Sequence, residues 1–284
     1  SKTLQIRLEN KVYFFYGRIK NLNANCPEDL RKITDGFNNK DFLCRLDGAF
    51  AACIYDLDKK KLFIKTDNFG QVPIYFFIKD NKFIFSTDTK YIFDAGINKE
   101  VDKVKVAEYL QFIHYSTRRT YFKKIYKIAS KELIIVDFSN KYNLTRSLYE
   151  IDGKSKNNES NKVYSYLKKS FDVNYENNKS KGIFLSGGID SSSVLSILHD
   201  IYHNQTINSY SFTFPFKNKS LEQKSSEKKL IDALTKNFNT KHIEFDGTNK
   251  DPFEYIDLSL SLTNTPSFFT NIYLFIDILE KARN

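Results

Sequence analysis

The chain has 284 residues, which is enough for two domains with full hydrophobic cores. Its net charge of +10 comes from lysines that are scattered along the chain and do not form a basic arm. The charge could attract nucleic acid or an acidic substrate, or it could simply follow from a lysine-rich composition. Three cysteines without C-x-x-C spacing and four histidines without a cluster exclude the common zinc sites, and no apolar run is long enough for a membrane span. We therefore expect a cytoplasmic protein with no membrane partner.

Residues 1–150 are dense in short strand signals separated by polar turns. Apolar, β-branched or aromatic runs that alternate with charged turns are typical of antiparallel hairpins. The expected strands are 12–16, 50–55, 62–66, 74–78, 83–86 and 133–137, and the expected helices are 29–38 and 104–114. This pattern predicts an α+β domain over residues 1–150.

The composition changes at residues 151–161, where Ser, Asn, Lys and Gly predict a linker. Strands and helices then alternate over residues 162–284. The expected strands are 182–185, 208–214 and 241–245, and the expected helices are 161–175, 191–203, 223–238, 251–262 and 272–283. This alternation predicts a doubly wound α/β domain, which binds ligands at the carboxyl ends of its strands.

The most specific motif of the chain lies between Ile183 and Ser192. An apolar strand ends in Ser186–Gly188, and Asp190–Ser192 fall at the start of a helix. Glycines let the backbone approach an anion, and a helix N-terminus favours a phosphate. No lysine follows the second glycine, which excludes the loop of NTPases that release the γ-phosphate. The motif predicts pyrophosphate binding, and the simpler alternative is a turn capped by Asp and Ser.

This loop resembles the S-G-G-x-D-S-S loop of the ATP pyrophosphatase (PP-loop) superfamily. The resemblance implies that the loop holds the β- and γ-phosphates of ATP, that Asp190 coordinates Mg²⁺, and that two strand ends frame the adenine. The residues implied in ATP and pyrophosphate binding are Leu185, Ser186, Gly187, Gly188, Asp190, Ser191, Ser192, Phe212 and Thr213. Helix capping is the alternative role for Asp190, and an ordinary core strand is the alternative for Phe212 and Thr213.

The first half carries a second resemblance, to the amino-terminal domain of the asparagine synthetases. The similar blocks, in order, are Leu46-Asp47-Gly48-Ala49-Phe50-Ala51, Tyr55-Asp56, Thr66-Asp67-Asn68-Phe69-Gly70, Val72-Pro73-Ile74-Tyr75 and Phe85-Ser86-Thr87. Each block alone is compatible with hairpin chemistry, but their order ahead of the PP-loop resembles the asparagine synthetase family over nearly the whole chain. The resemblance implies an Ntn-hydrolase-like domain, of the type 2 glutamine amidotransferase kind, followed by an adenine nucleotide α-hydrolase-like PP-loop domain.

The residues that would hydrolyse glutamine differ from that family. Its glutamine-using members begin with a cysteine nucleophile, whereas this chain begins with Ser1. In the substrate-holding block N-G-E-I-Y-N, Tyr16 replaces an oxyanion donor and Arg18 replaces the carboxylate that pairs with the glutamine ammonium group. We therefore expect an inactive glutaminase, a pattern that resembles the β-lactam synthetases and lasso-peptide cyclases.

Both ends are short relative to the resembled family. The chain has no methionine, and it ends at Asn284, before the segments that supply a second metal-binding Asp and a catalytic Lys in the family. We expect a truncated or processed form of a longer protein, with its catalytic residues beyond Asn284. The synthetase domain would be completed there or by a second chain, and a homodimer is the other expected assembly.

The resemblance implies an ATP-dependent amide-bond ligase that works through an acyl-adenylate, with ATP and Mg²⁺ as cofactors. Its expected partners are a carboxylate substrate and an amine nucleophile, possible substrates being a specialised metabolite or a peptide. The alternative is a glutamine-hydrolysing asparagine synthetase with further N-terminal residues. A PP-loop RNA-modifying enzyme or a non-catalytic scaffold is a candidate of another class, and nucleic acid is supported as a partner by the net charge alone.

Overall fold

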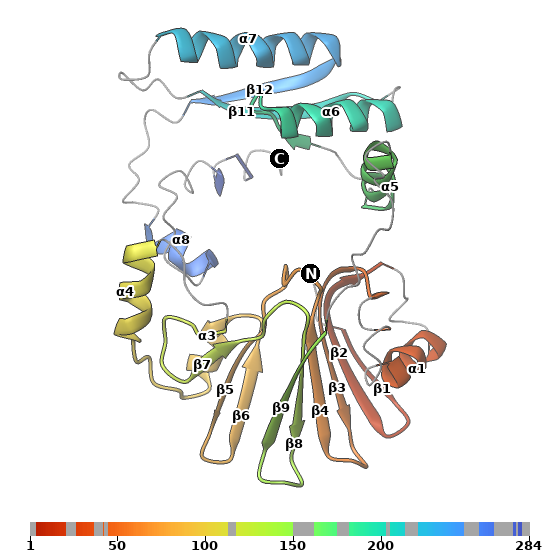
Figure 1. Ribbon diagram of the computed structural model, residues 1–284, viewed down its shortest axis with the longest axis vertical. Helices are drawn as coiled ribbons and strands as arrows, with labels where there is room; N and C mark the ends of the chain where they lie inside the picture. Colours follow the sequence, from red (N-terminus) through yellow and green to blue (C-terminus); the bar gives the residue numbers. More distant parts are fainter. Residues whose placement is uncertain are drawn as a thin grey trace. The chain divides into compact units, whose positions relative to one another are not determined.

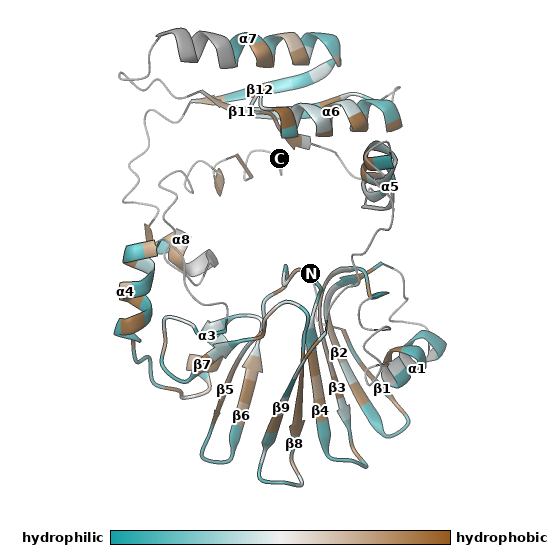
Figure 2. Cartoon of the chain, viewed as in Figure 1, coloured by the Kyte–Doolittle hydropathy of each residue, from teal (hydrophilic) through white to brown (hydrophobic). Residues whose placement is uncertain are grey.

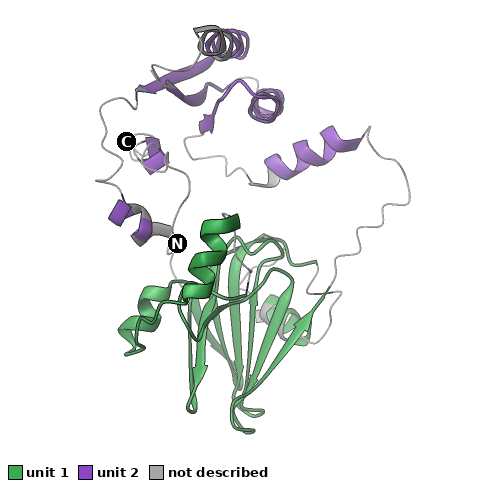
Figure 3. Cartoon of the chain, turned by 60° about the vertical axis from the view of Figure 1, so that its left-hand side comes forward, with its two compact units in different colours: residues 1–153 green, residues 154–284 purple. Residues whose placement is uncertain are grey.

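A computed structural model divides the chain into two compact units, Ser1–Gly153 and Lys154–Asn284 (Figure 3). The division falls inside the segment 151–161 whose composition predicts a linker. The residues that the structure describes are 4–20, 27–36, 42, 45–112, 118–149, 162–174, 182–202, 205–213, 221–246, 256–263, 275–276 and 278–279. None of the helices in these ranges is long and apolar enough to cross a membrane.

The first unit is built on two antiparallel sheets (Figure 1). The larger contains β1 (Leu4–Leu8), β2 (Lys11–Ile19), β3 (Gly48–Asp56), β4 (Lys61–Thr66), β8 (Glu132–Asp137) and β9 (Asn143–Leu148), in the order β1-β2-β3-β4-β8-β9. The smaller contains β5 (Tyr75–Lys79), β6 (Lys82–Ser86) and β7 (Ile125–Lys127), in the order β6-β5-β7. Hydrophobic residues run along the strands and hydrophilic residues gather at the hairpin turns, as Figure 2 shows.

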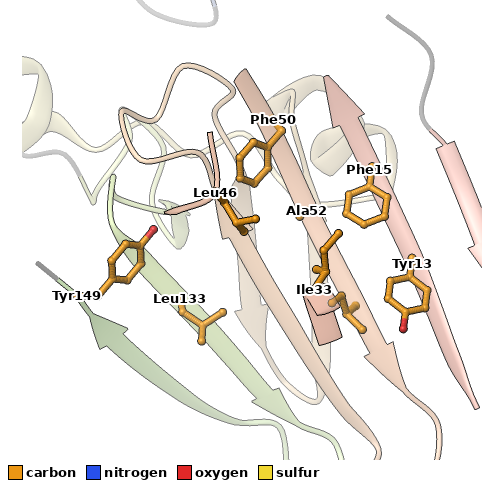
Figure 4. Close-up of a cluster of buried hydrophobic side chains, with 9 residues drawn as sticks. Tyr13, Phe15, Ile33, Leu46, Phe50, Ala52, Leu133 and Tyr149 are labelled. Carbon is orange, nitrogen blue, oxygen red and sulfur yellow. The ribbon is translucent and has the colours of Figure 1, made fainter. Parts of the chain in front are cut away.

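The larger sheet has an apolar cluster on each face. Because side chains alternate along a strand, β2 directs Tyr13 and Phe15 to one face and Phe14 and Tyr16 to the other. The first face is covered by α1 (Pro27–Gly36), whose Ile33 is fully buried in the cluster (Figure 4). A proline at the first helical position and an acidic first turn favour the start of this helix.

The second face of the larger sheet packs against the smaller sheet. The cluster between them joins Cys53 of β3 to Phe76 of β5. On the far side of the smaller sheet, Tyr75 and Phe77 pack on Ile92 of α3 (Thr89–Asp94), and α4 (Lys103–Phe112) follows later in the chain. The unit therefore has four layers, in the order helix, sheet, sheet, helix.

One buried carboxylate organises the turn between β4 and β5. Asp67 is fully buried and accepts hydrogen bonds from the backbone N–H groups of Phe69 (3.0 Å), Gln71 (3.1 Å) and Val72 (3.0 Å). Gly70 lies in the same turn at φ +68°, a left-handed conformation that favours glycine. The aspartate and the glycine of this sequence block thus have a structural reason that is independent of any ligand.

The second unit is a parallel sheet with crossover helices. In chain order it contains α5 (Val163–Asn174), β10 (Gly182–Phe184), α6 (Ile189–Ile201), β11 (Ile207–Thr213), α7 (Leu221–Asn237), β12 (Thr240–Asp246) and α8 (Ile256–Thr263), and its strand order is β10-β11-β12. One cluster joins the sheet to α6 and α7, with the buried members Leu185, Leu195, Leu198, Tyr202, Ile207 and Ile231.

Both crossover helices therefore pack on the same face of this sheet. The opposite face carries Tyr210 and Phe245, which pack on Ile278 from the last helical residues of the chain. Among the described residues, Phe275 and Ile278 contact this second face. The α/β character of the unit is thus observed, and a sheet wound on both faces stays a prediction.

Candidate functional site

The connection between β10 and α6 is the candidate site. The strand ends at Phe184 and the helix begins at Ile189. The backbone N–H of Leu185 donates to the carbonyl oxygen of Tyr210 at 2.7 Å, so the loop leaves from a position still held by β11. Gly187 follows at φ +75°, where a side chain would strain the backbone. The sequence folds into this sharp turn because a glycine stands at that position.

Three serine hydroxyls gather around the loop backbone. Ser192 Oγ donates to the carbonyl of Gly188 at 2.8 Å, and Ser191 Oγ lies 3.1 Å from the same carbonyl. Ser186 Oγ is 3.1 Å from Ser191 Oγ, and the Ser186 N–H donates to Ser191 Oγ at 3.3 Å. Hydroxyl groups rotate to suit their partners. This cluster can therefore reorient its donors towards an anion without moving the backbone.

The start of α6 is open to an anion. Its N-cap residue is Gly188, with an extended backbone (φ −74°, ψ 161°) and no side-chain hydrogen bond that caps the helix. The first N–H groups of a helix lack intrahelical acceptors, and the helix dipole favours negative charge there. The Gly188 N–H donates to Ser186 Oγ at 3.4 Å, so a serine braces this turn, and the simpler interpretation of the motif as a turn capped by Asp and Ser stays an alternative. Asp190 lies within the first turn and exposes its carboxylate.

These residues fit a magnesium nucleotide. The loop offers N–H and O–H donors for phosphate oxygens, and Asp190 offers one carboxylate for a cation. Within the described ranges no group of three or more His, Cys, Asp or Glu side chains gathers to hold a metal. Mg²⁺ is commonly held by one or two carboxylates together with phosphate oxygens and water. The donor set therefore suits a metal that arrives with the nucleotide.

The other residues implied in nucleotide binding lie at the ends of β10 and β11. The side chain of Leu185 is 1% exposed and packs in the core under α6, so only its backbone is available to a ligand. Phe212 and Thr213 end β11, and Thr213 pairs with Asp246 of β12. The ring of Phe212 packs edge-on against Phe275, with 5.3 Å between centroids. The parallel sheet thus brings these residues to the same edge as the loop.

Phe184 is a further candidate site residue, which the sequence analysis did not name. Its side chain is 41% exposed, directly precedes the loop and contacts the ring of Phe275 at 5.7 Å between centroids. The alternation of the strand contained the signal, because Phe184 must face away from the core side occupied by Ile183 and Leu185. An exposed aromatic ring therefore lies beside the turn, at a position where the apolar run alone would predict a core residue.

A polar cluster lies between the sheet and α7. His242 Nδ1 is 2.8 Å from Ser209 Oγ, and its Nε2 is 2.9 Å from Ser211 Oγ. Glu244 lies 3.9 Å from the same imidazole and pairs with Lys228 at 2.7 Å. Burial lowers the pKa of His242 below its ordinary value, although the Glu244 carboxylate opposes the shift. These hydrogen bonds can satisfy the half-buried imidazole in its neutral form.

In the first unit, the residues of the glutamine-holding block lie on β2. Gly17 has φ +90°, and a Cβ there would approach the carbonyl oxygen of Ala49 to 2.2 Å, so the glycine is required by the close pairing with β3. Tyr16 lines an apolar cavity of about 210 Å³, and Arg18 exposes its side chain on the same face of the strand. The glycine of the block lies in the strand, but a phenol ring and a cation flank it.

Two family models match the chain. The glutamine amidotransferase domain model matches residues 34–149, and the asparagine synthase model matches residues 162–283. The first match begins after Tyr16 and Arg18, so it does not include the glutamine-holding block. Each match falls within one of the two compact units.

Two curated relatives are similar over much of the chain. A Methanocaldococcus jannaschii protein assigned as glutamine-hydrolysing asparagine synthetase 2 is 25% identical over 246 residues, which cover 84% of this chain and 46% of the relative. Glutamine-hydrolysing asparagine synthetase 1 of Bacillus subtilis is 24% identical over 206 residues, which cover 70% of this chain and 31% of the relative. The chain therefore spans less than half the length of these relatives.

Two solved structures are distantly similar. The glutamine phosphoribosylpyrophosphate amidotransferase from B. subtilis, complexed with ADP and GMP, has a TM-score of 0.31 and 10% identity, covering 71% of this chain and 47% of that chain. An allosteric regulatory enzyme of purine biosynthesis has a TM-score of 0.34 and 8% identity, covering 87% of this chain and 72% of that chain. Similarities at this level carry no argument about function.

Proposed function

The chain belongs to the asparagine synthetase family, and on that basis we propose that it acts as an ATP-dependent carbon–nitrogen ligase that activates a carboxylate as an acyl-adenylate. The observation that supports this function is the loop from Ser186 to Ser192. It combines a left-handed glycine, a helix start whose N-cap residue is a glycine, and three linked serine hydroxyls, two of which contact the carbonyl of Gly188. Such an arrangement suits the triphosphate end of a nucleotide.

In the proposed reaction the substrate carboxylate attacks the α-phosphorus of ATP, and the bond from that phosphorus to the bridging oxygen of the β-phosphate breaks. Pyrophosphate leaves, and the backbone N–H groups at the start of α6 stabilise its charge together with the hydroxyls of Ser186, Ser191 and Ser192. Mg²⁺, held with Asp190, would neutralise phosphate charge. An amine then attacks the acyl carbon, loses a proton and displaces AMP, which leaves an amide.

The residues around the loop suggest where the adenosine lies. The rings of Phe184 and Phe212 both contact Phe275 on the face of the sheet opposite to α6. An adenine ring can stack on exposed aromatic side chains, and backbone groups at the end of β11 can read its edge. We expect Leu185 to contribute backbone groups only, because its side chain is buried.

The nitrogen source is proposed to be an amine of the substrate or free ammonia. Tyr16 and Arg18 support this, because an arginine at the place of a carboxylate repels an α-ammonium group and a tyrosine replaces an amide donor. A specialised metabolite or a peptide is then the proposed substrate. The printed names of the two curated relatives support the alternative, a glutamine-hydrolysing asparagine synthetase.

The exchange of radiolabelled pyrophosphate into ATP in the presence of candidate carboxylates tests the first claim. We expect exchange with the wild-type protein and its loss in Asp190→Ala. Asp232→Ala, which removes an exposed carboxylate from α7 of the same unit, is the matched control and should keep the exchange rate. Release of γ-phosphate without AMP would show that the loop serves another reaction.

A second assay separates the two nitrogen sources. The protein is incubated with glutamine, with and without ATP, and glutamate is quantified by mass spectrometry. We expect no glutamate above background in either case. Glutamate release together with conversion of aspartate to asparagine would establish the asparagine synthetase alternative.

A further inference from the structure

The two sheets of the first unit differ in width, and the smaller one leaves part of the larger uncovered. At one side the cover is complete, since the guanidinium carbon of Arg146 on β9 lies 5.3 Å from the ring centroid of Phe76 and 5.9 Å from that of Tyr126. At the other side the smaller sheet ends at β6, and among the described strands only β5 pairs with it. Strands β1 and β2 of the larger sheet continue beyond that edge.

Burial falls off along a row of paired residues that crosses the larger sheet. The register aligns Ile134, Ile64, Cys53, Phe14 and Gln5 on the face towards the smaller sheet. The first three are buried, Phe14 is half-buried, and Gln5 is exposed. The apolar floor therefore extends one strand past the covered region, to β2, and becomes polar at β1.

An apolar cavity of about 210 Å³ lies where the cover ends. Its walls come from both sheets and include Phe14, Tyr16, Ala51, Cys53, Ile74 and Phe85. A cavity of about 150 Å³ lined by apolar side chains is large enough for a benzene ring. The cavity between the sheets thus has room for one aromatic or large aliphatic side chain, and Ser86 and Thr87 place hydroxyls on its wall.

The neighbouring edge of β6 can hold a polypeptide backbone. An edge strand presents N–H and C=O groups on the side without a partner, and an added strand can pair with them. Phe83 and Phe85 of β6 face the cluster between the sheets, whereas Ile84 faces α3. A strand placed beside β6 would therefore direct alternate side chains into the cavity and over Phe14.

The charge around the cavity indicates the chemistry of the partner. On the face of β1 and β2 towards the cavity, Arg7 and Arg18 expose cationic side chains, and the described part of that face carries no carboxylate. An apolar floor within a basic rim suits a segment in which carboxylates flank an apolar side chain.

We propose that the first unit binds an extended segment of an acidic peptide, which pairs with β6 and inserts one apolar side chain into the cavity between the sheets. The site is thus a peptide-recognition surface on the unit whose glutamine-holding residues are replaced. That the segment belongs to the substrate of the ligase rests on the proposed function. The strand pairing and the filled cavity rest on the first unit alone.

Binding is tested by fluorescence anisotropy with a labelled peptide of sequence Glu-Thr-Val-Thr-Phe-Thr-Val-Thr-Glu, in which Glu, Val and Phe share one face of a strand. We expect saturable binding that weakens with added salt. A peptide with Ser in place of Phe should bind about tenfold or more weakly. Methylation of alternate backbone nitrogens, which removes strand donors without changing side chains, should abolish binding to the wild-type protein.

Matched variants locate the site. Ala51→Leu fills the cavity and should weaken binding of the Phe peptide about tenfold, whereas Ala95→Leu, the same change at an exposed position, should not alter it. A peptide with Ala in place of Phe should bind Ala51→Leu and wild type equally. Should Ala51→Leu fail to fold by circular dichroism, the methylated peptide still decides. Equal binding of methylated and unmethylated peptides, or a β6-mediated dimer that the peptide does not compete with, would overturn the proposal.

Pyrophosphate exchange in the same preparation separates this proposal from the proposed function. Exchange without peptide binding would reject the peptide site and leave the ligase in place. Peptide binding without exchange under any substrate would reject the ligase and leave the site. An increase in exchange when the bound peptide carries the reacting carboxylate would support both.

Discussion

Removal of the Asp67 carboxylate is expected to destabilise the first unit by about 3 kcal/mol. Asp67 is fully buried and accepts three backbone N–H groups, at 3.0, 3.1 and 3.0 Å. Hydrogen bonds to a charged group contribute about 1.5–3 kcal/mol each, so the loss of all three in Asp67→Ala would cost at least about 4–5 kcal/mol if the three N–H groups stayed unpaired. Water can reach the exposed residues Phe69 and Gln71 after the change, which lowers the expected loss to about 3 kcal/mol.

Asp67→Asn should lie between the two proteins. Its amide oxygen can still accept from Phe69 and Gln71, but its NH₂ group would face the N–H of Val72, and we expect a loss of about 1–2 kcal/mol. Urea unfolding followed by tyrosine fluorescence measures both changes, since the chain has 18 tyrosines and no tryptophan. Asp58→Ala, which removes an exposed carboxylate bonded to Asn10, is the control and should stay within about 0.5 kcal/mol of wild type. The same small change in Asp67→Ala would refute the reasoning.

Three further predictions follow from single residues. Gly187→Ala should weaken ATP binding in isothermal titration calorimetry, because φ +75° is a strained conformation for a residue with a side chain. Gly96→Ala, at φ +87° with open space around it, is the control and should leave ATP binding unchanged. Equal effects of the two variants would reject the role of the loop. Burial raises the pKa of Cys53 well above its ordinary range, so iodoacetamide at pH 8 should modify Cys53 only after urea unfolding, and rapid native labelling would contradict this. Burial lowers the pKa of His242 below 6.5, so the contribution of the neutral imidazole to the stability of the second unit is full above about pH 6.5 and is lost as the pH drops through the folded pKa. The thermal midpoint should therefore decrease when the pH is lowered from 7.5 to 5. The variant His242→Asn should show a smaller decrease.

Most strands and helices could be predicted because their patterns are local. β3, β4, β8 and the helices α6 and α7 have continuous apolar periodicity, and the structure places them within a few residues of the predicted bounds. β9 was missed because its sequence Asn-Leu-Thr-Arg-Ser-Leu has only two apolar residues, and its strand form comes from pairing with β8. β7 and the short helix α3 were missed because three and six residues give too short a pattern. β1 was also missed, although the alternation of Leu4, Ile6 and Leu8 is a strand signal.

The candidate site divides in the same way. The PP-loop is contiguous, so glycine, serine and aspartate positions predicted its geometry directly. The serines also brace the turn, as the simpler capped-turn interpretation expects, since the Gly188 N–H donates to Ser186 Oγ, while the cap position itself falls on Gly188. The cavity could not be predicted, since its walls come from β2, β3, the residue before β5 and the end of β6, and only tertiary packing brings these segments together.

Tyr16 connects the two proposals for the first unit. A residue that holds glutamine must present polar donors. Tyr16, however, pairs with Ala51 across the strands, and its half-buried side chain lines the same apolar cavity as Phe85. Tyr16, which stands where the resemblance implies an oxyanion donor, therefore supplies apolar area to the cavity wall. Gly17 remains because its pairing with Ala49 leaves no space for a Cβ, whatever ligand the strand serves. The side chains of this strand thus suit an apolar residue beside cationic groups, which is what the proposed peptide site requires.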